Sequence, residues 1–329
     1  MLINQCQSIK ERGEMMQKEQ ADNPMISVIM STFNEKKSWL TESINSILNQ
    51  TYSNFEFIII VDNPLNKEII GLINSYKAKD RRIRFFINEK NQGLVYSLNF
   101  ALSVAQGHYI ARMDADDIAD NERLQIQLDF MIENNIDIVG SNIIYFNENS
   151  DIKKSSLLLK SNDIKDNMRY WSQLAHPTWL IRKEVYDTLK GYRDIKYCED
   201  YDFLLRAMKN NYVLANIERP LLRYRISTNG ISRSNLLEQR LISQYLSKNY
   251  DRIDTLTIHE IQSFLAKKKI SKRKKSNYKK ANDIYQEYCV ESNFIKKIYY
   301  LIKSFICSYT HFKVEYLPQI KRKLKQLYN

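Results

Sequence analysis

The sequence predicts an α/β protein with a mostly parallel, doubly wound sheet flanked by helices, followed by a basic helical region. Short apolar segments alternate with segments of helical periodicity over the first half of the chain. Residues 55–61 (FEFIIIV) are almost continuously apolar, which is typical of a strand buried on both faces of a parallel sheet. Basic residues are concentrated at the end, since residues 230–329 hold 21 Lys and Arg against 8 Asp and Glu.

The expected elements follow one another in the order that such a sheet requires. Strands are expected over residues 26–30, 55–61, 83–87, 109–113, 136–146 and 178–181. Helices are expected over residues 39–48, 67–76, 94–105, 125–133 and 202–208, where apolar residues recur at helical spacing. Residues 155–170 are ambiguous, and the chain from Leu236 onward has helical periodicity without a strand signal.

Charge and composition divide the chain into three parts. We expect a polar tail over residues 1–24, an α/β domain over residues 25–230 and a basic helical region over residues 231–329. The tail lacks the apolar segment of a secretory signal, and no run of ~18 uncharged apolar residues predicts a membrane-spanning helix. The four cysteines are far apart and form no CxxC pair, which fits a reducing cytosol.

Two features of composition constrain the ligand chemistry. The chain has only 7 glycines and never two within a short loop, which excludes a glycine-rich phosphate cradle. Asp114-Ala115-Asp116-Asp117 follows a predicted strand, and three neighbouring carboxylates repel one another unless a cation lies between them. Oxygen ligands of this kind favour Mn²⁺ or Mg²⁺ bridging a substrate phosphate. The alternative is that Asp116 or Asp117 caps a helix beginning near Asn121, or that the turn is simply solvated.

Polar residues at strand ends are the candidate site residues, because ligands of parallel sheets bind at the carboxyl ends of strands. They are residues 32–35, Asp62 and residues 114–117. A second acidic group, Glu199-Asp200-Tyr201-Asp202, opens a predicted helix. Carboxylates favour a first helical turn on dipole grounds alone, but one of them could also act as a general base.

Together these motifs resemble glycosyltransferase family 2, whose members have the GT-A fold. The resemblance rests on residues 27–35 (SVIMSTFNE), Val61-Asp62, Asn91-Gln92-Gly93, residues 109–117 (YIARMDADD) and residues 199–202 (EDYD), in the order and spacing of the family. It covers residues 25–224. The branch it resembles most is that of bacterial capsule, exopolysaccharide and O-antigen synthesis, to which His176-Pro177-Thr178 and Arg182-Lys183 are also similar.

The resemblance implies a role for each matching residue. Asp116 would ligate the metal on the diphosphate, and Asp200 would be the catalytic base of an inverting displacement that converts an α-linked donor into a β-linked product. The nucleotide sugar would be bound by Thr32, Phe33, Glu35, Asp62, Asn91, Gly93, Arg112 and Asp114. His176, Glu199 and Arg225 are further candidates for acceptor or diphosphate contacts.

Some of these residues have an alternative role. Arg112 could bind ligand or pair with a nearby acid, and His176 could contact the acceptor or be structural. Asn63-Pro64 stands where many relatives have a second acid and a glycine. Residues 225–229 (RISTN) lack a histidine that some relatives place there, so Arg223 or Arg225 would have to supply positive charge.

The basic C-terminal region predicts attachment to an anionic membrane surface. Residues 267–280 form a cationic run, and apolar residues recur at helical spacing over residues 294–306 with lysines among them. The alternatives are an amphipathic helix packed on the protein, or nucleic-acid binding, which we do not expect because no nucleic-acid motif is present. The resemblance implies a lipid-linked saccharide acceptor and a peripheral location at the cytoplasmic face of the bacterial inner membrane.

The sequence thus favours a metal-dependent transferase that uses a UDP-sugar, with UDP-galactose or UDP-N-acetylgalactosamine as first donors to try. The alternative class is a catalytically idle GT-A-like module that docks proteins or polyanions through its basic region. A nucleotidylyltransferase would need a glycine-rich loop after the first strand, and residues 31–35 contain no glycine. A homodimer is compatible with the sequence, which does not determine the oligomeric state.

Overall fold

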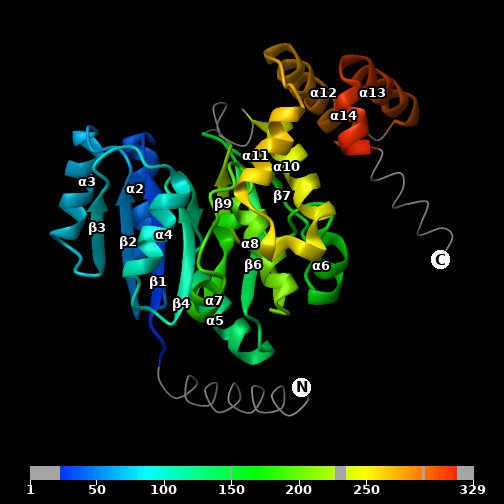
Figure 1. Cartoon of the computed structure of the whole chain (residues 1–329). Helices are drawn as coiled ribbons and strands as arrows, with labels where there is room; N and C mark the ends of the chain where they lie inside the picture. The colour runs from blue at the N-terminus through cyan, green and yellow to red at the C-terminus, as the bar shows by residue number, and fades with distance from the viewer. Residues whose placement is uncertain (1–22, 149, 227–234, 291–292, 317–329) are drawn as a thin grey trace, which may run out of the picture. The chain divides into compact units, whose positions relative to one another are not determined.

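The structure is a computed structural model that describes residues 23–148, 150–226, 235–290 and 293–316 (Figure 1). Most of the expected N-terminal tail, residues 1–22, lies outside this part, as does the expected boundary at residues 230 and 231. Contacts divide the described chain into two compact units. The first comprises residues 23–168, 172–194 and 206–226, and the second comprises residues 169–171, 195–205 and those from 235 onward.

The first unit contains one mixed sheet, drawn as the arrows of Figure 1. Within the described residues its strand order is β3-β2-β1-β4-β8-β6-β9-β5, with β7 paired to β6. The strands are β1 (Ile26–Thr32), β2 (Phe55–Val61), β3 (Ile83–Ile87), β4 (Tyr109–Asp114), β5 (Ile118–Ala119), β6 (Ile138–Phe146), β7 (Asp151–Lys154), β8 (Leu180–Arg182) and β9 (Leu214–Arg225).

The four N-terminal strands form the parallel half of the sheet that the sequence predicts. β1 pairs in parallel with β2 on one side and with β4 on the other, and β2 pairs in parallel with β3. Thr32 lies opposite Val61, and Ser31 lies opposite Asp114. The carboxyl ends of three adjacent strands therefore meet at one edge, where the chain order reverses between β1 and β4.

The other half of the sheet differs from the expectation. β8 is antiparallel to β4 and to β6, and β9 runs parallel to β6 and antiparallel to β5. The strand expected over residues 178–181 begins later, because residues His176–Thr178 form a 3-10 turn before β8. β5, β7 and β9 were not expected from the sequence, and β9 is the longest strand described.

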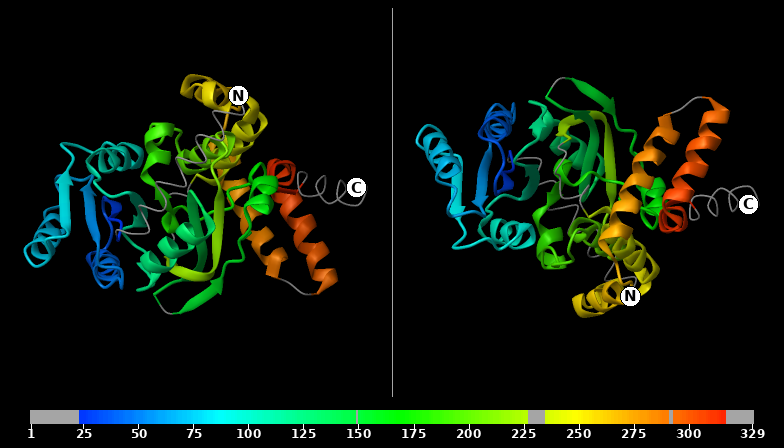
Figure 2. Two further views of the ribbon diagram at one scale, coloured as in Figure 1. Left: turned by 90° about the horizontal axis from the view of Figure 1, so that it is seen from below. Right: turned by 90° about the horizontal axis from the view of Figure 1, so that it is seen from above.

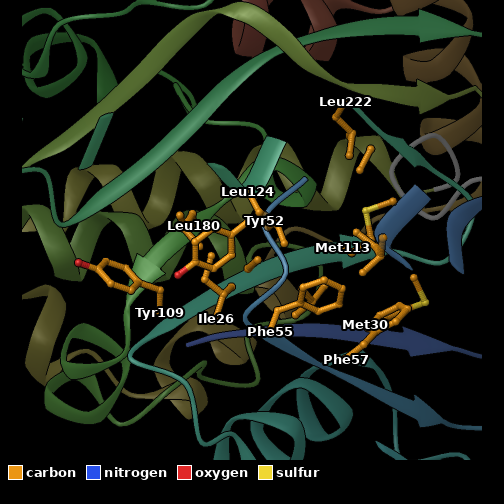
Figure 3. Close-up of a cluster of buried hydrophobic side chains, with 14 of the residues drawn as sticks. Ile26, Met30, Tyr52, Phe55, Phe57, Tyr109, Met113, Leu124, Leu180 and Leu222 are labelled. Atoms are coloured by element: carbon orange, nitrogen blue, oxygen red, sulfur yellow. The ribbon is translucent and has the colours of Figure 1, made fainter. Parts of the chain in front are cut away.

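Helices flank the sheet on both sides. Within the first unit they are α2 (Lys37–Leu48), α3 (Lys67–Lys77), α4 (Leu94–Val104), α5 (Arg123–Asn134), α6 (Ser161–Met168) and α7 (Lys183–Leu189), and α8 (Glu199–Lys209) begins in the second unit and ends in the first. Apolar residues of α2, α3 and α5 join those of the sheet in one buried cluster, part of which is shown in Figure 3. α4 packs on β1 and β2 but contributes nothing to this cluster, so it covers the opposite face.

The second unit is helical in its described residues, as the sequence predicts. It contains α10 (Leu236–Lys248), α11 (Ile258–Lys267), α12 (Lys272–Val290), α13 (Phe294–Cys307), the short α14 (Tyr309–His311) and a π-helical turn over Phe312–Tyr316. A small core of Leu237, Leu241, Tyr278 and Val314 holds it together. Glu315 is buried in this unit, where it accepts hydrogen bonds from Arg240 Nε at 2.8 Å and Tyr278 Oη at 2.5 Å. None of the helices described is both long and apolar enough to cross a membrane.

Candidate active site

The acidic loop, residues 114–117, lies at the carboxyl end of β4 and leads into β5. Asp114 and Asp116 are partly exposed, whereas Ala115 and Asp117 are buried. Alternate residues of an extended segment point the same way, so Asp114 and Asp116 share the more exposed side of the loop. Ser43 of α2 donates a hydrogen bond to the Asp114 carbonyl at 2.8 Å. Neither Asp116 nor Asp117 caps the next helix, because α5 begins at Arg123 with Glu122 in the cap position.

The pKa of the partly exposed Asp116 carboxyl is raised above its ordinary value. Burial, followed by the neighbouring carboxylates of Asp114 and Glu35, raises the pKa of Asp116 to about 7. Burial also raises the pKa of Asp117 well above its ordinary value, again with contributions from Asp114 and Asp116. The loop therefore concentrates negative charge that the protein itself does not fully compensate.

Glu35 brings a fourth carboxylate to the loop, from the turn that follows β1. Its Oε2 accepts hydrogen bonds from Thr32 Oγ1 at 2.6 Å and from the Phe33 amide at 2.8 Å. These bonds hold Glu35 in the turn that follows β1, while the Phe33 side chain is exposed. Thr32, Phe33 and Glu35, which the sequence analysis grouped together, thus form one turn next to the acidic loop.

Asp62, at the end of β2, organises the connection that leads to α4. Its Oδ1 accepts from Asn88 Nδ2 at 2.7 Å and from the Gln92 amide at 2.8 Å, and its Oδ2 accepts from the Gly93 amide at 2.8 Å. Asn91 Oδ1 accepts a further bond from the Gly93 amide at 3.1 Å. Gly93 has φ +88°, a backbone conformation that other residues rarely adopt. Asp62 therefore holds Asn91 and Gly93 beside the end of β2.

Arg112 is buried in β4 and pairs with an acid, which is one of the two roles that the sequence left open. Its Nη2 donates to Asp114 Oδ1 and its Nη1 donates to the Met113 carbonyl. Arg112 Nε is buried with no hydrogen-bond partner among the described residues. The pair partly neutralises Asp114 and fixes its carboxylate, so Arg112 acts on the site through Asp114.

Arg225, at the end of β9, holds the acidic loop through hydrogen bonds to residues 116 and 117. Its Nε donates to the Asp116 carbonyl at 2.7 Å, its amide donates to Asp117 Oδ1 at 2.8 Å, and its Nη2 pairs with Glu42. The guanidinium also lies over the rings of Trp39, at 5.1 Å, and Phe146, at 4.4 Å. These partners leave the Arg225 side chain almost fully buried against the loop. Arg223 instead pairs with Asp151 at 2.7 Å.

His176, in the 3-10 turn before β8, belongs to an aromatic cluster. Its Nε2 forms a hydrogen bond with Tyr192 Oη at 2.9 Å, and Tyr192 Oη in turn bonds Tyr186 Oη at 2.8 Å. The imidazole also packs edge-on against Trp179, with ring centroids 4.5 Å apart. Burial, followed by the positive charge of Arg112, lowers the pKa of His176 well below its ordinary value. A neutral, packed histidine of this kind matches the structural role.

Glu199 and Asp200 lie in the first turn of α8, within the second unit. Asp200 Oδ1 accepts a hydrogen bond from the Tyr201 amide at 2.7 Å. Both carboxylates are partly exposed, whereas Asp202, two residues further on, is fully buried. Of the three acids in this turn, Glu199 and Asp200 are thus the two that solvent reaches.

The acidic loop fits a divalent cation that is shared with a substrate. Among the described residues, no three His, Cys, Asp or Glu side chains form a metal cage by themselves. Mg²⁺ and Mn²⁺ are commonly held by one or two carboxylates together with waters and substrate phosphates, so a cage is not required. Burial, followed by the carboxylates of Asp114 and Glu35, raises the pKa of Asp116, and a cation bound there would offset both effects. Asp116, with Asp114 beside it, is the group that fits this role.

Sequence reasoning missed the residues that fix the loop from neighbouring elements. Ser43 and Glu42 of α2 bind the Asp114 carbonyl and Arg225, and the Trp39 and Phe146 rings enclose the Arg225 guanidinium. None of these residues belongs to a motif, and their partners lie 71 to 183 positions away for the two polar contacts. The pairing of β9 with β5 and β6 brings Arg225 and Phe146 to the loop, whereas Ser43 contacts it from α2.

The sheet ends in carboxylates at its β1/β4 switch point, without a glycine-rich loop, and comparison with known proteins shows the class of enzyme that carries this arrangement. Residues 27–209 match the family model described as Glycosyl transferase family 2. The chain belongs to this family and is a glycosyltransferase, and its fold is GT-A with an added helical C-terminal region.

Relatives of known sequence agree with this assignment. The chain is 40% identical over 233 residues to an uncharacterized glycosyltransferase of Methanocaldococcus jannaschii, an alignment that covers 70% of this chain and 80% of the relative. It is 34% identical over 241 residues to the O-antigen biosynthesis glycosyltransferase WbnJ of Escherichia coli, covering 69% and 94%. The amylovoran biosynthesis glycosyltransferase AmsE of Erwinia amylovora is 29% identical over 212 residues, covering 64% and 79%.

Solved structures share the fold at low sequence identity. TarS of S. aureus, solved in complex with UDP-GlcNAc, superimposes with a TM-score of 0.56 at 19% identity, covering 74% of this chain and 71% of that one. The mannosyltransferase PcManGT of Pyrobaculum calidifontis, in complex with GDP-Man and Mn²⁺, has a TM-score of 0.54 at 14% identity, covering 86% of both chains.

Proposed function

We propose that this glycosyltransferase moves a hexosyl group from a UDP-sugar to a hydroxyl of a lipid-linked saccharide, in the synthesis of a bacterial surface polysaccharide of the capsule, exopolysaccharide or O-antigen type. The observation that carries the proposal is the convergence of Asp114, Asp116 and Glu35 at the ends of β1 and β4. The names of the relatives in O-antigen and amylovoran biosynthesis support the type of product. Galactose and N-acetylgalactosamine are the sugars that we would test first.

The donor would lie along the carboxyl ends of β1, β2 and β4. The turn that contains Thr32, Phe33 and Glu35 would face the uracil and ribose, and the exposed Phe33 ring offers a surface for the base. Asp62 would shape this pocket by holding the Asn91–Gly93 connection in place. Asp114, which Arg112 orients, would meet the ribose or the metal.

The diphosphate would lie over Asp116. A bound Mn²⁺ or Mg²⁺ would neutralise the charge that develops on the diphosphate as the sugar leaves. Asp116 would supply a carboxylate for that cation, and Arg225 would keep the Asp116 backbone in position through its carbonyl. Arg225 would support the loop rather than contact the diphosphate, because its guanidinium is already bound to the Asp116 carbonyl, Glu42 and two rings.

Asp200 would be the general base of a single displacement. Its carboxylate would accept the proton of the acceptor hydroxyl, whose oxygen forms the new bond to the anomeric carbon from the face opposite the leaving group. The bond from the anomeric carbon to the diphosphate oxygen breaks in the same step, and UDP leaves with the electron pair. Such a displacement inverts the anomeric centre. The partly exposed position of Asp200 in the first turn of α8 suits a group that must reach a substrate.

Substitution of Asp200, the proposed general base, should affect the transfer step without affecting donor binding. We expect Asp200→Asn to lower transfer by at least about 10²-fold, the lower end of general-base contributions, while UDP binding stays unchanged. The measurement is turnover of a panel of UDP-sugars together with UDP-induced thermal stabilisation. Asp194→Asn is the matched control, because Asp194 is an exposed acid six residues away. Wild-type turnover in Asp200→Asn would remove Asp200 from the mechanism, and no turnover by wild type with any nucleotide sugar would favour the idle binding module.

The second part of the proposal is a peripheral location at the cytoplasmic face of the bacterial inner membrane. A lipid-linked acceptor is confined to a bilayer, so an enzyme attached to the same surface meets it more often. The excess of basic residues in the last hundred positions supports attraction to anionic lipids.

A further inference from the structure

The second unit carries an exposed apolar face on α13. Ile295, Ile302, Ile306 and Tyr309 are 77%, 53%, 77% and 64% exposed. Ile298, Tyr299 and Phe305 are exposed as well, and together these seven residues recur at intervals of three and four. We call them the α13 apolar face. Six of them lie on one side of α13, and Tyr309, at the start of α14, extends the stripe beyond the C-cap of that helix, Ser308.

The opposite side of α13 is already occupied. α13 lies against α12, and the two helices run side by side in both views of Figure 2. Ser304 is fully buried between them and donates a hydrogen bond to the Ala281 carbonyl of α12 at 3.0 Å. The α13 apolar face therefore points away from its own helical unit, and an isolated stripe of this size on a protein surface marks an interaction site.

Basic side chains border this stripe. Lys296 and Lys303 are exposed on one side of it, and the Lys303 ammonium lies 5.3 Å from the centre of the Tyr299 ring. On the neighbouring helix, Lys272, Arg273, Lys279 and Lys280 are exposed along the first half of α12, with Asp283 and Glu287 on its second half. An apolar stripe bordered by lysines and tyrosines is the pattern of a helix that lies in the interface of a bilayer.

A small basic hollow continues the stripe at the C-terminal end of α13. It has a volume of about 340 Å³, and its lining includes Ser271, Arg273, Lys274, Ser308, Tyr309 and Thr310. Tyr309 lines the hollow, and its ring packs edge-on against Phe305 of the apolar face, with ring centroids 5.9 Å apart. The hollow therefore adjoins the apolar face. Lys275 is paired with Glu238, whereas Arg273 and Lys274 form no ion pair within the described residues.

We propose that this surface docks on an anionic membrane, with the α13 apolar face inserted at the level of the acyl-chain boundary and a lipid phosphate in the hollow between Arg273, Lys274 and the neighbouring hydroxyls. Two cations and several hydroxyl donors suit a phosphate oxygen group. A second copy of the chain is a poorer occupant, because pairing two such faces would bring their lysines together. The inference rests on the proposed membrane location and goes further by naming the inserting face and a head-group site.

The apolar face is tested with the full chain and sedimented vesicles. One set contains phosphatidylcholine alone and another contains added phosphatidylglycerol. We expect binding to the anionic vesicles and about tenfold weaker partitioning for Ile306→Glu, since a charge would enter the interface. Ile152→Glu, at an exposed isoleucine of β7, is the control and should bind like wild type. Equal binding by Ile306→Glu and wild type would overturn the insertion.

The hollow is tested with two variants that remove the same charge from the same helix. Arg273→Gln/Lys274→Gln loses the hollow, whereas Lys279→Gln/Lys280→Gln loses two exposed cations outside it. We expect the first pair to weaken binding to anionic vesicles by about fivefold more than the second, because only the first contacts a lipid phosphate. Equal losses would mean general charge attraction and would overturn the head-group site.

Two further readouts separate this inference from the proposed reaction. UDP-induced thermal stabilisation should be the same in all four variants as in wild type, which shows that each variant is folded with its donor site intact. A wild-type protein that binds UDP but neither type of vesicle would overturn the docking surface and leave the proposed reaction standing. Light scattering that shows a dimer converted to a monomer by Ile306→Glu, with vesicle binding unchanged, would assign the face to a second copy instead.

Discussion

At the scale of single residues, the three aspartates of the acidic loop make different contacts with the rest of the protein. Asp114 is held by Arg112 and Asp117 accepts from the Arg225 amide, so both are tied to the scaffold. Asp116 is bound to the scaffold through its backbone carbonyl, which accepts from Arg225, and its carboxylate carries the raised pKa. The contacts of Asp114, Asp117 and the Asp116 carbonyl thus hold the loop in place, and the Asp116 carboxylate is the group that we propose binds the cation.

The raised pKa of Asp116 predicts a pH dependence of stability. The pKa of Asp116 is about 7 in the folded protein against 3.8 for the free side chain, so the native state holds this proton more tightly than the unfolded state does. The resulting stabilisation is complete below about pH 4 and is lost as the pH rises through about 7. In metal-free buffer the melting temperature should therefore fall more between about pH 5 and pH 8 in wild type than in Asp116→Asn.

Adding Mn²⁺ should reverse this trend, because a cation binds the deprotonated carboxylate. The stabilisation that Mn²⁺ gives to wild type should grow between about pH 6 and pH 8, and it should be absent from Asp116→Asn at every pH. Parallel pH curves for the two metal-free proteins would show that Asp116 has an ordinary pKa, and the electrostatic account of the loop would then be wrong.

At the scale of elements, the connection from β3 to α4 depends on one backbone conformation. Gly93 has φ +88° and open space around its Cα hydrogens, so an added methyl group meets no atom but forces a strained backbone. We expect Gly93→Ala to lower the free energy of unfolding by about 1 kcal/mol and to weaken UDP binding, since Asp62 accepts from the Gly93 amide. Denaturant unfolding and a UDP titration measure the two effects.

Gly71→Ala is the matched control for that substitution. Gly71 lies inside α3, where nothing approaches the position of a Cβ and φ is ordinary. Alanine favours a helix interior over glycine by up to about 1 kcal/mol, so this variant should be as stable as wild type or more stable. If both variants behave alike, Gly93 has no special role in the connection.

The elements also show what a single sequence reveals. β1, β2 and β4 are buried along almost their whole length, and β3 is a shorter, partly buried apolar run. Their local pattern was sufficient to predict all four. β9 was missed because its sequence LANIERPLLRYR mixes charges and a proline with apolar residues, and its pairing with β6 shifts register near Pro220. The apolar run of β4 therefore predicted where the acidic loop lies. The hydrogen bonds between this loop and Arg225 depend on strand pairing between distant segments, which the sequence does not show.

The same limit applies to the side chains of the site. Arg112 and His176 had two open roles each, and the sequence does not show the contacts that favour the supporting role: Asp114 for Arg112, and Tyr192 with Trp179 for His176. The roles of Asp116 and Asp200 stay predictions that rest on motif and chemistry. The sequence pattern predicted the residue types at the sheet edge, and tertiary contacts decide which of them support and which can act.

At the scale of the whole molecule, the chain joins two units of different character. The first unit carries the sheet and the acidic loop, and the second carries the excess of basic over acidic residues and the α13 apolar face. Donor binding is thus proposed for the first unit and membrane attachment for the second. UDP-induced thermal stabilisation measures the former, and vesicle binding measures the latter.

The measurement that tests the central claim most directly is a thermal-shift titration of UDP with and without Mn²⁺ on wild type and Asp116→Asn. Ligand that binds the native state raises its melting temperature by mass action. We expect UDP to stabilise wild type only when Mn²⁺ is present, and Asp116→Asn to show no such rise. Stabilisation of both proteins to the same extent, or of neither, would contradict a metal-assisted nucleotide site at the acidic loop.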